Sequence, residues 1–323
     1  MSEPGIMSYA IDPELLPWLD MLPTFELKDY DDLVAGRAQV AEARARMPVY
    51  EPARPLDIRD ELIPGPEGAP DVRVRIYTPA GLTGPVPGLV YIHGGGFVVG
   101  DIDMTDNTAK IYADKVGIVV VSVDYRLAPE TPFPGPVEDC YAALVWTANK
   151  ASELGIDPAR IGVAGESAGG GLTAGTVLLA RDRGGPAVSF QYLGIPELDD
   201  RLETESMRTY VDTPLWNYPK AVFSWDSYLG EGKRGGADVS PYAAPLRATD
   251  LSGLPPTVVT VMQFDPLRDE GMEYARRLLH AGVPTDLRGY AGTFHGSSTI
   301  AEAAVSKRMA VDALEDLRRG LRV

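Results

Sequence analysis

The sequence predicts an α/β fold in which a mainly parallel β-sheet is flanked by helices. From about residue 86, short runs rich in β-branched residues alternate with longer segments whose apolar residues recur every three or four positions. The chain has 323 residues, 45% of them hydrophobic, which is enough for one large domain with a substantial core. We therefore expect a single α/β domain, extended by at most a small insert.

The individual elements follow from the local patterns. The runs expected to form strands of the sheet lie at residues 87–93, 117–125, 160–165, 256–262 and 285–290. Residues 57–65 and 71–79 have the pattern of an antiparallel pair at the sheet edge. The covering helices are predicted at residues 137–150, 172–183, 269–281 and 300–321.

Two regions do not follow the alternation of strands and helices. Residues 1–50 contain several prolines and a helical pattern over residues 31–47. Residues 197–243 are rich in tryptophan, tyrosine, phenylalanine and charge. These regions are either separate surface elements or parts of one lid. The α/β domain would then consist of residues 51–196 and 244–323.

Composition and charge exclude several classes of protein. With 30 basic and 46 acidic residues, the net charge of −16 would repel nucleic acid. The lone Cys140 requires no oxidising compartment, and we expect it to be a small packing residue in a buried helix. The N-terminus shows no signal-peptide pattern, and no stretch approaches the ~18 apolar residues of a membrane span. A cytoplasmic protein that binds no membrane is expected.

Residues 163–171, VAGESAGGG, place Ser167 between a predicted strand and a predicted helix. The stretch from Gly165 to Gly169 matches the G-x-S-x-G pattern, in which serine occupies a tight turn and its hydroxyl is exposed as a nucleophile. Side chains at the flanking glycines would collide with the neighbouring strand and helix. A simple βα turn without chemistry is the alternative interpretation.

A second glycine-rich stretch, HGGGF at residues 93–97, follows another predicted strand. Consecutive glycines let backbone N–H groups face a ligand, as the oxyanion hole of an acyl-transfer enzyme requires. A phosphate-binding loop is the alternative, but no Gly-Lys-Ser/Thr follows and the dinucleotide-binding glycine spacing is absent. The pattern therefore favours an oxyanion hole.

A nucleophilic serine needs a general base, and the chain offers three histidines. We expect His93 to orient the glycine loop by hydrogen bonding. His280 falls near a predicted helix end, where interaction with the last carbonyl groups is expected. His295 lies in a loop after the last predicted strand and is the candidate base.

An acidic residue must hold the imidazole in the correct tautomer. Asp265 directly follows a predicted strand, so its carboxylate is expected to lie at the same sheet edge as Ser167. Asp269 is the rival, but its position favours capping or opening the next helix. We therefore favour Asp265, which gives the chain order Ser167, Asp265, His295 of the α/β-hydrolases.

The chain resembles the hormone-sensitive-lipase-like branch of the α/β-hydrolases, which includes many bacterial carboxylesterases. The matching pieces are HGGGF, VDYRLAPE followed by FP, GESAGGG, SPYAAPLR, DPLRDEG and His295, in consistent order over residues 90–297. The resemblance implies an α/β-hydrolase fold with a helical cap, built from residues 1–50 and from 197–243, the insertion after the sixth strand. Many relatives pair through the last strand and its neighbouring helix, so a homodimer is an alternative to a monomer.

The resemblance also implies the roles of particular residues. Ser167 would be the nucleophile, His295 the base and Asp265 its orienting acid. The oxyanion hole would consist of the backbone amides of three residues, Gly95, Gly96 and Ala168.

The sequence departs from the family pattern beside the predicted base. Relatives usually have an aromatic residue where this chain has Ser297, and we hypothesise that its loss enlarges or wets the site beside His295. Met262-Gln263-Phe264 replaces a segment that is usually Ala-Glu-Phe. The stretch Ile195–Asp199 lacks the usual Tyr-Pro. These departures leave the predicted triad intact.

Two further patterns have simpler interpretations. Asp101 to Asp106 space their carboxylates like a calcium loop but lack its glycine and glutamate, so a polar loop is expected. The aromatic residues of the irregular regions either wall an acyl pocket or form the core of the cap; they are Trp18, Trp216, Tyr218, Phe223, Trp225 and Tyr228.

Together these observations predict a carboxylesterase that acts on short- to medium-chain acyl esters of small molecules through an acyl-enzyme, without metal or organic cofactor. The same triad could act instead on an amide, thioester, lactone or acetylated small molecule. A relative that has lost catalysis and binds a ligand is the alternative outside the enzymes. It would be expected to lack a triad residue, whereas all three are present.

Overall fold

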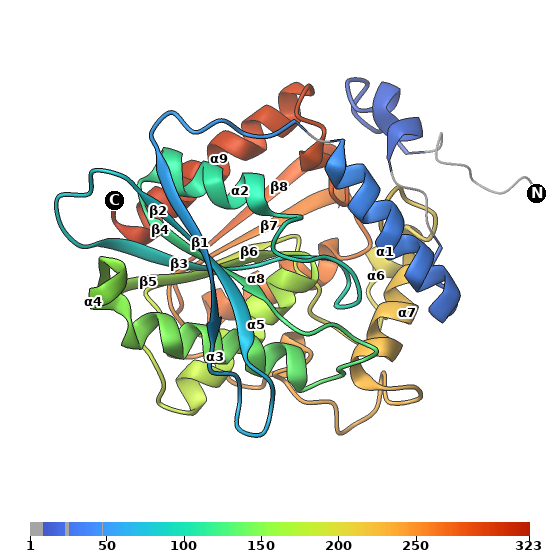
Figure 1. Cartoon of the computed structure of the whole chain (residues 1–323). Coiled ribbons are helices and arrows are strands. Elements are labelled where there is room, and N and C mark those ends of the chain that lie inside the picture. Colours follow the sequence, from blue (N-terminus) through green and yellow to red (C-terminus); the bar gives the residue numbers. More distant parts are fainter. Residues whose placement is uncertain (1–8, 23–25, 47) are drawn as a thin grey trace, which may run out of the picture.

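The computed structural model describes residues 9–22, 26–46 and 48–323. Its centre is one eight-stranded sheet (Figure 1) in the order β1-β2-β4-β3-β5-β6-β7-β8. The strands are β1 (Leu56–Ile63), β2 (Val72–Pro79), β3 (Val86–Ile92), β4 (Val119–Asp124), β5 (Ile156–Glu166), β6 (Phe190–Gly194), β7 (Thr257–Phe264) and β8 (Thr285–Phe294). β2 pairs antiparallel with β1 and β4, and all other neighbours are parallel. The predicted sheet and its antiparallel edge are confirmed.

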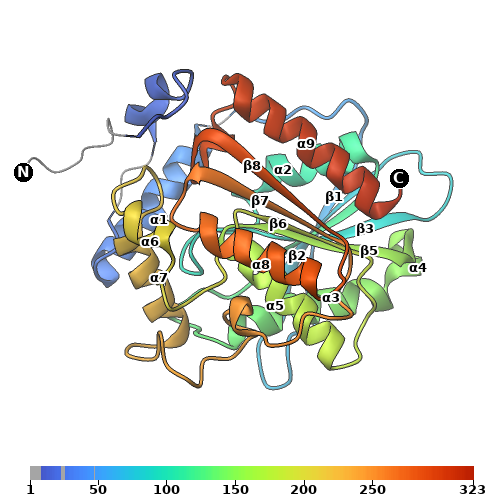
Figure 2. The same cartoon turned by 180° about the vertical axis from the view of Figure 1, so that it is seen from behind.

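Helices cover both faces of the sheet (Figures 1 and 2). α3, α5 and α8 pack on one face, and α2, the π-helical turn η3 and α9 pack on the other. In the described part of the chain, no helix has the length and apolar character needed to cross a membrane. The covering helices are α2 (Asp106–Ile111), η3 (Tyr112–Val116), α3 (Gly135–Asn149), α4 (Ala151–Leu154), α5 (Ala168–Asp182), α8 (Arg268–His280) and α9 (Ala304–Leu321).

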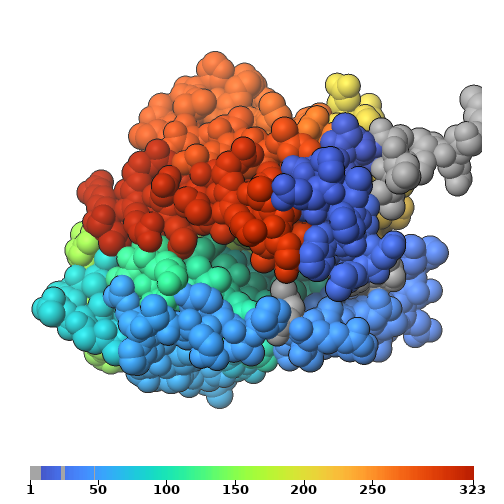
Figure 3. All heavy atoms as spheres, turned by 90° about the horizontal axis from the view of Figure 1, so that it is seen from above, coloured from blue at the N-terminus to red at the C-terminus, as the bar shows by residue number. Residues whose placement is uncertain are grey.

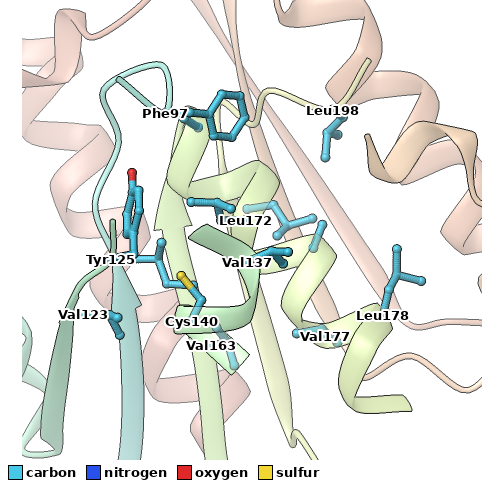
Figure 4. Close-up of a cluster of buried hydrophobic side chains, with 14 of the residues drawn as sticks. Phe97, Val123, Tyr125, Val137, Cys140, Val163, Leu172, Val177, Leu178 and Leu198 are labelled. Atoms are coloured by element: carbon cyan, nitrogen blue, oxygen red, sulfur yellow. The ribbon is translucent and has the colours of Figure 1, made fainter. Parts of the chain in front are cut away.

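The alternation of side chains along the strands divides the core into two layers. Val121 and Val123 of β4 belong to the cluster beneath α3 and α5, whereas Val120 belongs to the cluster beneath α2 and α9. Cys140 of α3 lies among the first cluster (Figure 4), fully buried as predicted. Burial raises the pKa of its thiol.

Several elements differ from the sequence prediction. β6 was not predicted, because the run FQYLG is short and contains Gln191, whose Nε2 donates to the Thr257 hydroxyl at 2.8 Å. α2 and η3 occupy a segment that we did not predict as helical. α9 begins at Ala304, four residues later than the predicted start, because Ala303 is extended.

The two irregular regions lie together at one end of the molecule (Figures 1 and 2). The Tyr9 hydroxyl donates to Asp212, and the Tyr9 ring lies 5.6 Å from the ring of Tyr210. Arg37 of α1 donates to the carbonyl of Val98 at 2.8 Å, and so joins the first region to the loop after β3. The elements of the two regions are η2 (Leu16–Met21), α1 (Tyr30–Ala45), α6 (Glu205–Thr209) and α7 (Tyr218–Leu229).

The N-terminal region also contacts the end of the chain. Figure 3 shows the described part of the N-terminal region, in dark blue, beside the C-terminal part of the chain, in red. Asp12 donates its backbone N–H to Gly292 at 2.8 Å, and Ala304 donates to the carboxylate of Glu14 at 2.7 Å. Two short 3₁₀ turns, η4 (Pro245–Arg247) and η5 (Ser297–Thr299), complete the fold. Residues 1–8, 23–25 and 47 of the predicted N-terminal cap segment lie outside the described residues.

Candidate active site

Ser167 lies in the turn between β5 and α5. β5 ends at the residue before it and α5 begins at the residue after it. Its backbone angles, φ 58° and ψ −125°, are rare for a residue with a side chain. The side chain lies at the carboxyl end of the parallel strands, with 8% of its surface exposed. The predicted strand-turn-helix around this serine is present.

The glycines on either side of Ser167 are required by close backbone contacts. A Cβ atom on Gly165 would lie 2.3 Å from the carbonyl oxygen of Gly169. A Cβ on Gly169 would lie 2.2 Å from the carbonyl oxygen of Ile92 and 2.5 Å from that of His93. Both distances are far below van der Waals contact, so the predicted collisions are confirmed.

The side chains of Ser167, His295 and Asp265 form a continuous hydrogen-bonded chain. His295 follows β8 and Asp265 follows β7, so both lie at the same sheet edge as Ser167. The Ser167 Oγ to His295 Nε2 distance is 2.9 Å, and the His295 Nδ1 to Asp265 Oδ2 distance is 2.8 Å. An ionised carboxylate only accepts hydrogen bonds, so Nδ1 carries the hydrogen and Nε2 is free to accept from the serine.

Burial and a second hydrogen bond hold the carboxylate of Asp265 in place. The side chain of Asp265 is 1% exposed. Its other oxygen, Oδ1, accepts the backbone N–H of Leu267 at 2.9 Å. The carboxylate is therefore held from both sides, which favours one orientation of the His295 ring.

Asp269 lies in the first turn of α8 and has a different environment. Its Oδ2 accepts the backbone N–H of Ser206 at 2.8 Å, and its Oδ1 accepts from the Arg268 guanidinium at 2.7 Å. It thus joins α8 to α6. The structure brings Asp265, and not Asp269, to the imidazole of His295.

The other two histidines lie away from the serine hydroxyl. His93 is buried, stacks on the Tyr125 ring at 4.1 Å, and has its Nδ1 2.7 Å from the carbonyl oxygen of Gly94. Burial lowers the pKa of His93 to about 4, so the ring is neutral at pH 7 and Nδ1 donates to that carbonyl. His280 is the last residue of α8 and is exposed, as expected.

The glycine loop adopts backbone conformations that require glycine. Gly95 has φ +117°, and a Cβ there would lie 2.0 Å from the carbonyl oxygen of Val99. Gly96 has φ +57°, and a Cβ there would lie 2.4 Å from the Trp216 ring. Side chains at either position would be excluded by conformation and by space.

This loop lies directly beside the serine. A Cβ on Gly94 would come 3.3 Å from the Cβ of Ser167. Among the residues that the structure describes, no hydrogen bond uses the backbone N–H of Gly95, Gly96 or Ala168. Unused N–H donors near a serine hydroxyl can stabilise negative charge that develops on a bound substrate.

The segment 197–243 contributes Leu215 and Trp216 to the site. The Trp216 ring lies 5.9 Å from the His295 ring, and a Cβ on Gly296 would lie 3.0 Å from Leu215. Of the other aromatic residues considered, Trp225 and Tyr228 are fully buried in the main core cluster. Trp216 belongs to the same core cluster with 6% of its surface exposed, so this ring contacts both the core and the surroundings of His295.

Ser297 lies two residues after His295, at the start of the 3₁₀ turn η5. Its side chain is fully buried, and its Oγ lies 3.8 Å from the sulfur of Met262. Leu215 and Trp216 both lie near this turn, and whether the serine enlarges or wets the site beside His295 stays a prediction.

Glu197 is a buried acid beside the site to which sequence analysis assigned no role. Its side chain has no exposed surface, and its Oε1 lies 3.1 Å from the hydroxyl of Ser224 on α7. Burial, the largest influence, raises the pKa of Glu197 to about 8, and the charge of Asp265 acts in the same direction. An acidic residue in the otherwise apolar run after β6 was the only sequence signal.

The acidic side chains of the loop at residues 101–106 form ion pairs with basic side chains. Asp103 lies 2.6 Å from Arg75, and Asp106 lies 2.7 Å from Lys110. Within the described ranges, no cluster of three or more histidine, cysteine or acidic side chains is arranged to hold a metal ion.

Comparison with known proteins places this geometry in a family. Residues 89–299 match a family model described as the alpha/beta hydrolase fold. The chain is 39% identical to carboxylesterase NlhH of Mycobacterium tuberculosis over 306 residues, covering 92% of this chain and 91% of that protein. It is 42% identical over 271 residues to carboxylic ester hydrolase LipN of the same organism, covering 82% and 70%.

A solved structure is also similar over nearly the whole chain. It is named bacterial heroin esterase, and it shares 52% sequence identity with this chain. The two superpose with a TM-score of 0.92, over 97% of this chain and 99% of that one. The likeness therefore extends beyond residues 89–299 and includes most of the first irregular region.

Proposed function

The chain belongs to the α/β-hydrolase family, in its hormone-sensitive-lipase-like branch, and is a carboxylesterase; from this premise we propose that Ser167, His295 and Asp265 are its catalytic triad. The observation that carries the proposal is the hydrogen-bonded chain from Ser167 Oγ through His295 to Asp265. The substrate is a small-molecule ester, consistent with the esterase names of its relatives.

The geometry supports a two-step acyl-enzyme mechanism. Ser167 Oγ attacks the ester carbonyl while His295 Nε2 takes its proton, and Asp265 stabilises the resulting imidazolium. The alcohol leaves with the proton from His295. Water then attacks the acyl-serine with His295 again acting as base, which releases the acid and restores the hydroxyl.

The amides of Gly95, Gly96 and Ala168 are the proposed oxyanion hole. Their N–H groups are not used within the described residues; Ala168 follows Ser167 directly, and the glycine loop approaches Ser167 at Gly94. A single oxyanion donor contributes about 2.7–4 kcal/mol to transition-state stabilisation. We further propose that His93 orients this loop, because its Nδ1 donates to the carbonyl of Gly94.

Residues 1–50 and 197–243 are the proposed cap over this site. Their contact through Tyr9 and Tyr210, and the position of Trp216 against His295, support this assignment. We propose a preference for short- to medium-chain acyl groups, because the bulky side chains of Leu215 and Trp216 lie beside Gly296 and His295 and would limit the room for a long chain.

Replacement of the Trp216 ring is expected to shift the acyl-chain preference. Trp216→Ala removes the ring that lies against Gly96 and beside His295, and so opens room for a longer chain. We expect the kcat/KM ratio of p-nitrophenyl decanoate to p-nitrophenyl butyrate to rise by about tenfold or more. Steady-state kinetics of both esters measure it.

Trp146→Ala is the matched control for that experiment. Trp146 lies on α3, in an outer groove with Pro64 and Tyr141. The control should leave the chain-length ratio unchanged. An equal ratio in wild type and Trp216→Ala would contradict the assignment of Trp216 to the acyl site.

The proposed function is tested by hydrolysis of p-nitrophenyl esters from acetate to palmitate. We expect turnover of the short and medium esters and a steep decline for the longest. A folded wild-type protein that is inert on every ester would overturn the proposal.

We also propose that a second copy of the chain pairs along β8. β8 is an edge strand, and an edge presents unpaired N–H and C=O groups. Leu287 on β8 and Val311 on α9 are 42% and 54% exposed. Light scattering after gel filtration should give a dimer mass for wild type and a monomer mass for Leu287→Arg. A wild-type monomer at every concentration would contradict this pairing.

A further inference from the structure

Helix α7 holds the part of the glycine loop that carries the Gly96 amide. The hydroxyl of Ser224 on α7 lies 2.8 Å from the Gly96 carbonyl oxygen, 128 residues away in the chain. The next residue of the loop, Phe97, stacks on Tyr228 at 4.1 Å and lies 5.3 Å from Trp225. All of these side chains are fully buried. The 197–243 segment therefore holds the glycine loop in place through both a hydrogen bond and aromatic contacts.

Glu197 connects the same serine to the nucleophile turn. Its Oε1 lies 3.1 Å from Ser224 Oγ, and its backbone N–H donates to the Ser167 carbonyl oxygen at 3.1 Å. Glu197 therefore touches the turn with its backbone and Ser224 with its side chain. The pair Glu197 and Ser224 therefore connects the turn that carries Ser167 with the glycine loop.

The number of hydrogens available to these contacts indicates the protonation state of Glu197. The Ser224 hydroxyl has one hydrogen, but two oxygens, those of Gly96 and Glu197, lie within hydrogen-bond distance of it. A carboxylate at Glu197 would leave one of those contacts without a hydrogen. A carboxylic acid supplies the missing hydrogen, so both contacts become true hydrogen bonds.

The second oxygen of Glu197 supports the same state. Oε2 is buried and has no hydrogen-bond partner among the described residues. Leaving a charged oxygen buried without a partner is far more costly than leaving a neutral carbonyl oxygen there.

We propose that Glu197 and Ser224 are positioning residues of the esterase: the Glu197 carboxylic acid donates to the Ser224 hydroxyl, which donates to the Gly96 carbonyl and holds the oxyanion loop in place. This inference rests on the proposed role of the Gly96 amide. Neither residue touches the substrate, and both act through the loop.

The surroundings of Glu197 favour the neutral acid. Burial raises its pKa to about 8. The titratable groups that face it are the acids Asp265 and Glu270 and the phenols of Tyr125 and Tyr228. None of these four groups carries a positive charge that would stabilise an ionised Glu197.

The arrangement predicts a loss of activity at alkaline pH. As pH rises through the Glu197 pKa of about 8, the carboxylate forms and competes with Gly96 for the single Ser224 hydrogen. The Gly96 carbonyl then loses its hydrogen bond. We expect kcat to fall above that pH while KM changes little, because the loop acts in the transition state.

Three variants test the proposal on p-nitrophenyl butyrate. Ser224→Ala should lower kcat by about 3- to 10-fold with KM near the wild-type value, the loss expected for one hydrogen bond. Glu197→Gln keeps an N–H donor toward Ser224 and cannot ionise, so it should retain neutral-pH activity and lose the alkaline decline. Thr176→Val removes a buried hydroxyl that has no partner in the described part of the chain, and should match wild type.

The outcomes separate this inference from the proposed function. Wild type inert on all esters overturns the proposed function and the inference with it. An active wild type with an unchanged kcat in a folded Ser224→Ala overturns the inference alone. If Ser224→Ala does not fold, the pH profile of Glu197→Gln decides: an alkaline decline identical to that of wild type overturns the inference.

Discussion

Ser167→Ala is expected to reduce kcat on ester substrates by a factor on the order of 10⁶. The alanine has no oxygen to attack the carbonyl or to carry the acyl group, so covalent catalysis is lost and only binding and the oxyanion donors remain. Initial rates with p-nitrophenyl butyrate measure the loss. The substitution removes one atom and leaves the backbone at the same φ of 58°, so the fold should be retained.

Ser297→Ala provides the control for that variant. Ser297 is also a buried serine near His295, but its hydroxyl contacts only the sulfur of Met262 in the described residues. It should keep a rate close to that of wild type. Retention of substantial esterase activity in purified Ser167→Ala would show that another residue is the nucleophile.

Asp265→Asn is expected to reduce kcat by about 10⁴-fold without unfolding the protein. The carboxylate accepts from His295 Nδ1 at 2.8 Å, and so sets the tautomer in which Nε2 can take the Ser167 proton. An amide carries no charge to stabilise the imidazolium, and its N–H₂ group can hold the ring in the wrong tautomer. The measurement is kcat for p-nitrophenyl butyrate at neutral pH.

Asp269→Asn separates a catalytic from a structural carboxylate. Asp269 accepts from the backbone of Ser206 and pairs with Arg268 rather than with the imidazole. Its substitution should lower the thermal unfolding midpoint more than it lowers kcat. A larger loss of kcat in Asp269→Asn than in Asp265→Asn would reverse the assignment of the acid.

Local sequence patterns were sufficient to predict the central elements of the sheet. The apolar, β-branched runs of β3, β4 and β7 can form few other structures, and they were placed within a few residues. The glycine pattern around Ser167 was equally informative, because the collisions that require glycine arise within one strand-turn-helix. The positions after β7 and β8 followed from the rule that parallel strands end at one edge.

Elements without such a local signature could not be predicted in the same way. β6 has five residues, and the Nε2 of its buried Gln191 donates to Thr257, 66 residues away in the chain. In α2 and η3, by contrast, a signal was present: Ala109, Tyr112, Ala113 and Val116 follow helical spacing and are all buried. That spacing could have identified the segment.

The support of the site depends on long-range packing that sequence patterns do not specify. Glu197 and Ser224 meet only after the segment 197–243 folds back over the sheet edge, and Ser224 reaches a loop 128 residues away. Likewise, Leu215 and Trp216 come to lie near His295 and Gly296, a contact that no local pattern around His295 could reveal. The sequence predicts the reacting groups better than the residues that hold them.

The most direct test of the account is to locate the covalent adduct formed by an organophosphate ester such as diethyl p-nitrophenyl phosphate. The reagent phosphorylates an activated serine, and the stable adduct marks the residue that would carry the acyl group. The account predicts a single adduct on Ser167, found by peptide mass spectrometry, with activity lost in equal proportion and no adduct in Ser167→Ala. An adduct on another residue, or full ester hydrolysis after complete labelling of Ser167, would contradict it.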